Sequence, residues 1–502
     1  MLSTLLSGCV QGLRASLVRV EVDLQAGLPS FCVVGLPDTS IKESKERVRA
    51  AFKNSDISFP MKRITVNLAP AHIPKEGSSF ELAIALSLLM ADQRWECGAF
   101  QKYLFLGELS LQGNINPVRG ILPVVLAAQK AGLEKVFVPL ANAQEAAMVP
   151  MLQVYGVQNL KEMVQVLKNE ISLTAVTRGE EKSFSQTSSL DFSEVRGQHW
   201  AKKALEIAAA GSHNILMMGP PGCGKSMLAQ RFPSILPPLS FKESLEVAQI
   251  YSVAGLMKKE TYVTRPFRSP HHTISYSALV GGGRGALMPG EISLSHRGIL
   301  FLDELSQFRK DVLEVLREPL EERKISICRT DGRYLYPADF LLVAAMNPCP
   351  CGYLRHPKKE CLCPEPIIQR YRQKVSGPLL DRIDLHVSVS SMSLEDLPPQ
   401  EEEPSQKILD RVVVAREIQK KRLKQWPFLT NAQMTPPAIV KFCVLQEEAE
   451  KMLRQAVDQF GLSYRTYHKI LRVSRTIADL DQKEQILSEH VAQSIQLRFL
   501  DR

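Results

Sequence analysis

The sequence predicts an α/β protein whose central domain is built on a parallel β-sheet. Three short apolar runs in the middle of the chain, at 215–218, 298–302 and 340–346, have the length and composition of buried strands. Each run is followed directly by residues suited to polar chemistry, beginning with Gly219, Asp303 and Asn347. Because the carboxyl ends of parallel strands meet at one edge of a sheet, we expect these residues to lie close together.

The first run leads into a glycine-rich loop with the spacing G-x-x-x-x-G-K-S, the phosphate-binding loop of nucleotide hydrolases. This loop consists of Gly219, Pro220, Pro221, Gly222, Cys223, Gly224, Lys225 and Ser226. Its backbone N–H groups and the positive end of the next helix are suited to hold phosphates. Lys225 is expected to reach the β- and γ-phosphates of ATP, and the Ser226 hydroxyl to ligate Mg²⁺. The flanking strand and helix disfavour a chance match to a glycine-rich turn.

The second and third runs supply the remaining chemistry that ATP hydrolysis needs. Asp303 is expected to hold Mg²⁺, largely through water, and Glu304 to polarise the attacking water as a general base. The Asn347 amide is placed to contact the γ-phosphate and that water. An ordinary acidic turn and a turn asparagine before Pro348 are the alternatives, and the phosphate-binding loop weighs against both.

Composition sets broad limits on the protein. The 502 residues, 45% hydrophobic and 23% charged, are typical of soluble globular proteins and suffice for two to four domains. A net charge of +9 permits a polyanionic partner without requiring one. The ten cysteines are scattered apart from one cluster, which favours a reducing compartment. No run is long enough to span a bilayer and no signal peptide is evident, so we expect a cytoplasmic protein without a membrane partner.

The first third of the chain, residues 1–170, is predicted to be a separate α/β or α+β domain. Strands are expected at 17–24, 31–36, 64–68, 104–109 and 136–139, and helices at 39–53, 81–90 and 121–131. Residues 171–190 are mostly polar and are predicted to be a linker.

Three segments of this domain, at 75–80, 107–113 and 117–120, resemble the proteolytic domain of Lon, which has a ribosomal S5-like fold. The resemblance places Ser79 at the position of the nucleophile. Leu122 and Val124 occupy the candidate positions of the activating lysine, and a serine needs an adjacent base. We therefore expect a Lon-protease-like domain kept for binding or ring building, as in the DNA-repair ATPase RadA, rather than for proteolysis.

Residues 191–395 resemble the ATPase core of AAA+ proteins. Gly197 and Gln198, before a predicted helix, match the segment that cups adenine, and Asn347 matches sensor 1. Residues 376–385 resemble the arginine-finger segment of magnesium chelatases and MCM helicases, so that Arg382 would reach the ATP of a neighbouring subunit. Such a shared site implies a ring, and the family implies a hexamer. A surface ion pair of Arg382 is the alternative, and two other arginines remain rival fingers, namely Arg370 and Arg372.

Residues 252–297 resemble the insertion that defines the helix-2-insert clade. Within it, His271 and His272 are expected to be structural, because adjacent side chains diverge. A hairpin is predicted at 324–336, turning at Asp331 and Gly332. Its arginines and tyrosines are candidates for contact with a nucleic acid, and a solvated hairpin is the alternative; they are Arg329, Arg333, Tyr334 and Tyr336.

Four cysteines follow Asn347 in the pattern C-x-C…C-x-C, namely Cys349, Cys351, Cys361 and Cys363. Four thiolates can complete a tetrahedral zinc site, with His356 as a substitute ligand for one of them. A zinc ion here is expected to be structural and to stiffen the loop after Asn347. Unligated cysteines that pack a loop are the alternative.

Residues 396–502 are predicted to form a helical lid. A basic helix is expected at 408–424, with a solvated face, and Gly461 is expected to end a later helix. The segment 463–480 resembles the sensor 2 helix of the chelatase and MCM clade. Arg465 matches its arginine and would contact phosphate, although simple helical charge decoration is the alternative.

Taken together, the order of Lon-like domain, chelatase-like AAA+ core with a cysteine insert and helical lid resembles the ComM/YifB family of magnesium-chelatase-like proteins. The resemblance implies a hexameric motor that uses ATP and Mg²⁺ to drive branch migration of DNA during natural transformation. Three rival functions are the motor subunit of a metal chelatase, an ATP-dependent protease and a non-catalytic nucleotide-gated scaffold. The intact Lys225, Asp303 and Glu304 argue against the scaffold.

Overall fold

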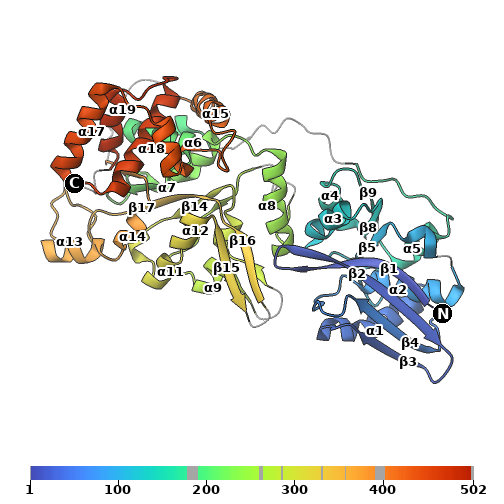
Figure 1. Ribbon diagram of the computed structural model, residues 1–502. Helices are drawn as coiled ribbons and strands as arrows, with labels where there is room; N and C mark the ends of the chain where they lie inside the picture. The colour runs from blue at the N-terminus through green and yellow to red at the C-terminus, as the bar shows by residue number, and fades with distance from the viewer. Residues whose placement is uncertain are drawn as a thin grey trace.

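The structure is a computed structural model that describes residues 2–95, 97–177, 190–258, 264–283, 287–329, 332–356, 358–390 and 402–498. It shows two lobes, with helix α8 (Phe241–Ala254) lying between them (Figure 1). The predicted domain boundaries stay predictions, because residues 178–189 and 391–401 lie outside the described part of the chain.

The first lobe is built on a seven-stranded sheet in the order β3-β4-β2-β1-β5-β8-β9. Strand β2 runs antiparallel to β1 and β4, and the other neighbours are parallel. The strands are β1 (Leu2–Gln11), β2 (Arg14–Gln25), β3 (Ser30–Val34), β4 (Arg63–Ala69), β5 (Tyr103–Phe105), β8 (Lys135–Pro139) and β9 (Gln153–Val157). A separate small ribbon pairs β6 (Glu108–Leu109) with β7 (Ile115–Asn116).

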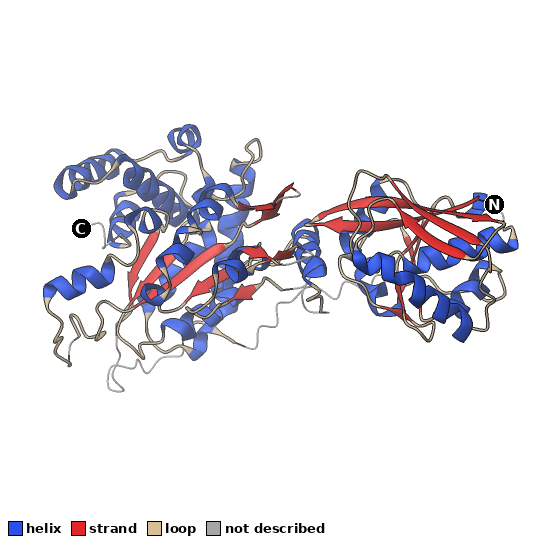
Figure 2. Cartoon of the chain, turned by 90° about the horizontal axis from the view of Figure 1, so that it is seen from below, coloured by secondary structure: helices blue, strands red, loops and turns tan. Residues whose placement is uncertain are grey.

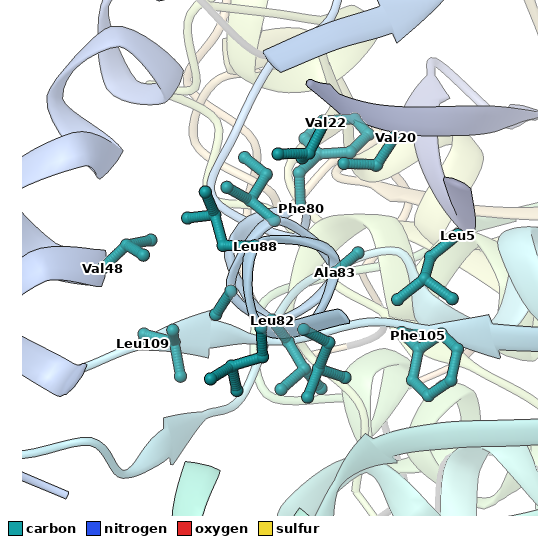
Figure 3. Packing of buried hydrophobic residues seen from close by; sticks show 14 of the residues in the cluster. Leu5, Val20, Val22, Val48, Phe80, Leu82, Ala83, Leu88, Phe105 and Leu109 are labelled. Carbon is teal, nitrogen blue, oxygen red and sulfur yellow. The ribbon is translucent and has the colours of Figure 1, made fainter. Parts of the chain in front are cut away.

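Helices cover both faces of this sheet (Figures 1 and 2). One face carries α1 (Thr39–Asn54), α2 (Glu81–Gln93) and α5 (Leu160–Leu167), and the other carries α3 (Ile121–Lys130) and α4 (Ala143–Ala146). Figure 3 shows α2 end-on, surrounded by Leu5, Val20 and Phe105. Every residue of α2 from Glu81 to Ala91 is buried, as expected of a helix that is apolar on nearly all sides.

The predicted strands and helices of this lobe are present, but the sequence analysis missed β9 and α5 as well as β1. In β1 the cause is visible in the residues. Its inward positions include Ser3 and Ser7, which are fully or almost fully buried and interrupt the apolar alternation. The Ser3 hydroxyl donates a 2.7 Å hydrogen bond to the Ser87 carbonyl, so its burial leaves no orphaned polar group. The predicted strand at 104–109 is split between β5 and β6.

The second lobe contains a five-stranded sheet in the order β11-β14-β17-β10-β18, in which all neighbours are parallel. The strands are β10 (Ile215–Met218), β11 (Phe267–Arg268), β14 (Ile299–Leu302), β17 (Leu341–Met346) and β18 (Leu385–Ser388). Residues of β10, β14 and β17 are buried throughout, which confirms the three predicted core strands. Strand β11 extends the core sheet, so part of the predicted insertion at 252–297 belongs to the sheet itself.

Short elements surround this sheet. The helices are α6 (His199–Gly211), α7 (Lys225–Arg231), α9 (Tyr276–Val280), α10 (Glu291–Leu294), α11 (Lys310–Glu314), α12 (Arg317–Glu322), α13 (Glu365–Arg372) and α14 (Gly377–Leu380). Two ribbons pair β12 (Gly281–Gly282) with β13 (Met288–Pro289), and β15 (Lys324–Arg329) with β16 (Gly332–Pro337). The predicted hairpin is therefore present, although Asp331 of its turn lies outside the described residues.

One of the two tyrosines of this hairpin is not free for stacking on bases. Tyr336 is fully buried and its hydroxyl donates a 3.0 Å hydrogen bond to the Leu287 carbonyl, so its predicted role in contacting nucleic acid is wrong. Tyr334 packs against the first lobe, where a Cβ added at Gly12 would come within 3.2 Å of its ring.

The lid consists of α15 (Ser405–Arg422), α16 (Pro436–Phe442), α17 (Glu447–Phe460), α18 (Tyr464–Leu480) and α19 (Ser488–Gln496). Gly461 ends α17 with a φ of 60°, as predicted. The expectation of a solvated basic face on α15 is only partly correct. Arg411 bonds Glu206 at 2.6 Å, and Arg416 donates to the Ala209 carbonyl at 2.7 Å, so both arginines tie the lid to α6.

The two lobes meet where α3 of the first packs on α8 of the second. The backbone N–H of Gly120 donates to the Ser252 carbonyl at 3.0 Å, and that of Leu122 donates to the Ser252 hydroxyl at 3.2 Å. Ala248 of α8 belongs to the same buried cluster as α3. None of the described helices is both long and apolar enough to cross a bilayer.

Candidate nucleotide site

A pocket of about 340 Å³ opens at the carboxyl edge of the five-stranded sheet. Strand β10 lies between β17 and β18 there, the kind of edge at which parallel α/β sheets bind ligands. The pocket is lined by Pro221, Gly222, Cys223, Gly224, Lys225, Ser226, Met227, Asp303, Glu304, Met346 and Asn347. The structure therefore brings together the polar ends of all three predicted strands.

The backbone of the phosphate-binding loop depends on its glycines at two points. A Cβ at Gly219 would collide with the Val389 carbonyl, because the loop passes directly against the end of β18. Gly224 has a φ of 91°, which side chains with a Cβ rarely adopt, and helix α7 starts at the next residue. The N-terminus of α7 thus points into the pocket, where its dipole favours an anion.

The Lys225 ammonium is held inside this loop. Its Nζ donates to the carbonyls of Gly219 and Pro220, each at 2.8 Å, and to Asn347 Oδ1 at 3.2 Å. The phosphate-binding loop thus holds the Lys225 ammonium in contact with Asn347, the residue predicted to be sensor 1. A triphosphate in the pocket offers stronger, charged acceptors for the same three donors.

Ser226 and Asp303 meet in the same pocket. The Ser226 hydroxyl donates to Asp303 Oδ2 at 2.6 Å. A hydroxyl and a carboxylate are the oxygen ligands that Mg²⁺ prefers beside phosphates, so the residues fit the predicted ion. When bound, the ion supplies positive charge that neutralises the phosphate oxygens.

Glu304 projects from the end of β14 with a φ of 50° and is more than half exposed. Its carboxylate lies 3.6 Å from Nδ1 of His272, and the ring of His271 packs against that of His272, with 4.1 Å between the ring centroids. Sequence reasoning gave these histidines structural roles only, and nothing in the sequence pairs His272 with Glu304. The contact arises because β11 is parallel to β14 and pairs with it, so the segment after β11 starts at the same carboxyl edge of the sheet.

The two arginines predicted to act on phosphate are absent from the lining of this pocket. Arg382 and Arg465 instead line a cavity of about 760 Å³ between the core and the lid. Glu321 lies between them, 2.5 Å from Arg382 and 3.7 Å from Arg465. Arg465 also lies 3.8 Å from Asp381.

The remaining predicted contacts are also placed by the structure. Gly197 donates its N–H to Glu402, and Gln198 Nε2 donates to the Ser390 carbonyl at 2.6 Å, so this segment borders the start of the lid. The rival fingers Arg370 and Arg372 are exposed near the end of α13, and Arg372 Nε donates to the Pro348 carbonyl at 3.3 Å.

Comparison with known proteins extends over the whole chain. Residues 191–397 match the family "Magnesium chelatase, subunit ChlI", residues 402–498 its C-terminal counterpart, and residues 20–142 "Subunit ChlI of Mg-chelatase". The competence protein ComM of Haemophilus influenzae is 41% identical over 100% of this chain and 98% of its own length. The uncharacterized protein YifB of Escherichia coli is 40% identical over 98% of this chain and 96% of its own length.

The chain belongs to the ComM/YifB family of magnesium-chelatase-like proteins. Membership in this AAA+ family implies ATPase activity, which fits the pocket described above. The Lon protease of Mycolicibacterium smegmatis is 27% identical over 32% of this chain and 21% of its own length, a match that supports a Lon-like domain.

In this family member, the four predicted cysteines form one cluster beside the nucleotide pocket. Their sulfur atoms all lie within 4.8 Å of one another, and three of the separations are 3.3, 3.6 and 3.6 Å. Four thiolates at about 2.3 Å from a tetrahedral zinc ion stand about 3.8 Å apart, so the cluster fits such an ion. His356 Nδ1 instead accepts the N–H groups of Lys358 and Lys359, at 3.0 and 3.1 Å.

The cysteine loop also touches the phosphate-binding loop. A Cβ at Gly352 would come within 2.5 Å of the Pro221 ring, so the two loops are in direct contact. Cys349 is fully buried two residues after Asn347. The cluster can therefore fix the positions of both Asn347 and Pro221.

The Lon-like lobe of this family member has its own pocket, of about 310 Å³, which contains Ser79. The Ser79 hydroxyl donates to the Gly8 carbonyl at 3.1 Å. Leu122 and Val124 are buried apolar residues, and neither a lysine nor a histidine is found among the described residues that line the pocket. Tyr334 of the second lobe completes its wall.

Proposed function

We propose that the protein forms a hexameric ring that couples ATP hydrolysis to movement on DNA, as a helicase or branch-migration motor in natural transformation and recombination. The main support is the separation of Arg382 from the phosphate pocket of its own chain. A cation needed at the transferring phosphate must then come from a second copy of the chain. A head-to-tail contact that closes on itself forms a ring.

In this proposal the residues of one chain bind and activate ATP, and the next chain completes the site. Lys225 and the N-terminus of α7 hold the β- and γ-phosphates. Glu304 accepts a proton from the attacking water, which Asn347 helps to orient. Arg382 and Arg465 of the neighbouring chain stabilise the charge that develops on the γ-phosphoryl oxygens.

The choice of DNA as the partner rests on similarity and charge. A relative that spans the full chain is named a competence protein, and competence is the uptake of DNA. The net charge of +9 favours a polyanion. Sequence-independent contacts to phosphates would make binding weaken steeply as salt rises.

The deciding experiment measures ATPase activity of the full chain with single-stranded, duplex and forked DNA and without DNA. We expect at least one form to bind and to stimulate turnover, with binding that falls as salt concentration rises. Absence of both binding and stimulation with every form would remove the DNA motor. The same preparation examined by mass photometry should contain hexamers when ATP is present.

A chelatase-type motor is the second candidate, because three family matches carry that description. It would bind a second protein that holds a porphyrin, and DNA would leave its ATPase rate unchanged. An ATP-dependent protease is disfavoured by the apolar Leu122 and Val124 near Ser79.

We also propose that the cluster of Cys349, Cys351, Cys361 and Cys363 binds a structural zinc ion. All four ligand positions are filled by sulfur, so no open position is left for chemistry. Its role is to hold the loop between Asn347 and α13 against the phosphate-binding loop.

A further inference from the structure

Four successive backbone carbonyls of the arginine-finger segment are held by side chains from distant parts of the chain. Lys469 Nζ donates to the carbonyl of Asp381 and, at 3.3 Å, to that of Ile383. Asn214 Nδ2 donates to the Arg382 carbonyl at 3.1 Å. Arg498 Nη1 donates to Ile383 at 3.2 Å and to Asp384 at 2.9 Å.

These donors come from two functional parts of the molecule. Asn214 is the residue before β10, the strand that carries the phosphate-binding loop, and its Oδ1 also accepts the N–H of Leu342 at 2.9 Å. Lys469 belongs to α18, one turn after Arg465, and Arg498 follows α19. The backbone of Arg382 is thus attached both to the nucleotide sheet and to the lid.

A buried polar bridge reinforces this attachment. The ring of His213 lies 3.2 Å from Asp384 Oδ2 through Nδ1 and 2.8 Å from the Thr476 hydroxyl through Nε2. Burial alone would raise the pKa of Asp384, but the hydrogen bond and charge of His213, together with the charges of Lys469 and Arg472, hold it well below its usual range. Asp384, the residue before β18, therefore stays charged, and the imidazole of His213, close to the start of β10, joins it to Thr476 of α18.

Lys469 is only 5% exposed, and its ammonium donates to two neutral carbonyls, those of Asp381 and Ile383. Burial lowers the pKa of its ammonium to about 8. The charged form of Lys469 therefore reduces the stability of the fold, because its ammonium has lost its contact with water. A buried methionine would fill the same space at a lower cost. A lysine at this position is explained if its ammonium is needed to hold the Asp381 and Ile383 carbonyls in place.

We propose that Lys469, with Asn214, is a positioning residue that fixes Arg382 to the lid, so that lid movement in one chain sets the finger that serves the next chain's ATP. This inference rests on the proposed function, because it assumes that Arg382 acts on a neighbouring site. Misplacement of a reacting group by about 1 Å can lower a rate by about 100-fold. Lys469 therefore controls turnover in the neighbouring chain without touching the nucleotide.

The first test compares Lys469→Met with Arg472→Met in the full chain. Arg472 lies on the same helix one turn later, but it donates to the Ala432 carbonyl within the lid, at 2.7 Å. We expect Lys469→Met to lower kcat by about 10-fold to 100-fold with little change in KM for ATP. Arg472→Met should keep kcat within about 2-fold, and Lys469→Arg should restore most of the activity. Equal losses in both methionine variants would overturn the proposal.

The second test mixes chains. Glu304→Gln chains have an inactive site of their own and an intact finger, so they should restore hydrolysis when mixed with Lys469→Met chains. Arg382→Ala chains mixed with Glu304→Gln chains provide the reference. If Arg382→Ala is rescued and Lys469→Met is not, Lys469 acts within its own chain and the inference is wrong. If neither variant is rescued, the proposed function is contradicted, because Arg382 then does not act on the ATP of a neighbouring chain.

A second variant tests the same proposal in case Lys469→Met fails to fold. Asn214→Asp keeps the acceptor for Leu342 and removes the donor to the Arg382 carbonyl. It should show the same loss of kcat and the same rescue by Glu304→Gln chains, and an unchanged kcat would contradict the proposal.

Discussion

The pocket at the phosphate-binding loop and the pocket around Ser79 each contain a residue whose motif indicates catalysis. In the first, a lysine, a hydroxyl, two carboxylates and an amide from three strands line one space. In the second, the hydroxyl of Ser79 faces a backbone carbonyl, and the expected base is replaced by buried Leu122 and Val124. A serine nucleophile needs an adjacent base, and the lysine expected for this purpose is absent. The difference shows that chemistry depends on the full set of groups and not on one matching residue.

The two pockets also differ in how they relate to the rest of the chain. Tyr334 and Leu287 of the second lobe help to line the Ser79 pocket, so it belongs to the contact between the lobes. By contrast, the described residues that line the phosphate pocket all belong to the second lobe. We infer that the Lon-like lobe serves as a binding surface for the second lobe, while the second lobe carries the residues for ATP hydrolysis.

The largest expected effect is that of Glu304→Gln on the phosphate pocket. Loss of the general base should lower kcat for ATP hydrolysis by at least about 100-fold. ATP binding, measured with a fluorescent nucleotide, should persist because the loop and Lys225 are unchanged. A turnover rate near that of the unaltered chain would mean that another group activates the water.

Loss of the cysteine cluster should have the next largest effect. Cys361→Ser should remove zinc from the purified protein, lower the unfolding temperature and reduce kcat by releasing Asn347. The matched control is Cys328→Ser, because Cys328 is exposed on the β15–β16 ribbon away from the cluster. Metal analysis that finds no zinc in the freshly purified, unaltered chain would defeat the zinc proposal.

Acid should weaken the attachment of α8, the helix between the two pockets, through Glu246. Hydrogen bonds from His296 and Arg297, at 3.3 and 2.9 Å, help to lower its pKa from 4.5 to about 2. A carboxyl with a lowered folded pKa stabilises the fold above its unfolded pKa, and that stability is lost as pH falls through the folded value. Glu246→Gln should therefore flatten the decline in unfolding temperature between pH 4.5 and 2. An identical decline in both chains would show that Glu246 is not responsible.

The smallest expected effect is that of Ser79→Ala. Ser79 lies outside the phosphate pocket, so the ATPase rate should stay within about 2-fold of that of the unaltered chain. Because the expected lysine is absent beside Ser79, an unfolded protein such as casein should remain intact with either chain. Degradation of casein that depends on both ATP and Ser79 would reverse the comparison and make the Lon-like lobe an enzyme.

Local patterns were sufficient for much of the fold. The runs at 215–218 and 298–302 are apolar and continuous because parallel strands are buried on both faces, and this makes them recognisable without a structure. The phosphate-binding loop is equally local, since its glycines and lysine act through backbone conformation over eight residues. Strand β1 was missed because buried Ser3 and Ser7 interrupt the alternation on which strand prediction relies.

What the sequence by itself determined is therefore the set of groups at the phosphate pocket, since Lys225, Ser226, Asp303, Glu304 and Asn347 each follow directly from a strand or loop pattern. Only the tertiary structure decided what those groups and the arginines contact. Contacts between residues far apart in the chain include those of His272 with Glu304 and of Gly352 with Pro221. The hydrogen bonds of Asn214 to the Arg382 carbonyl and of Lys469 to the Asp381 carbonyl are further examples. Such contacts depend on how strands are ordered and how the lid docks, and neither is encoded in a short stretch of sequence.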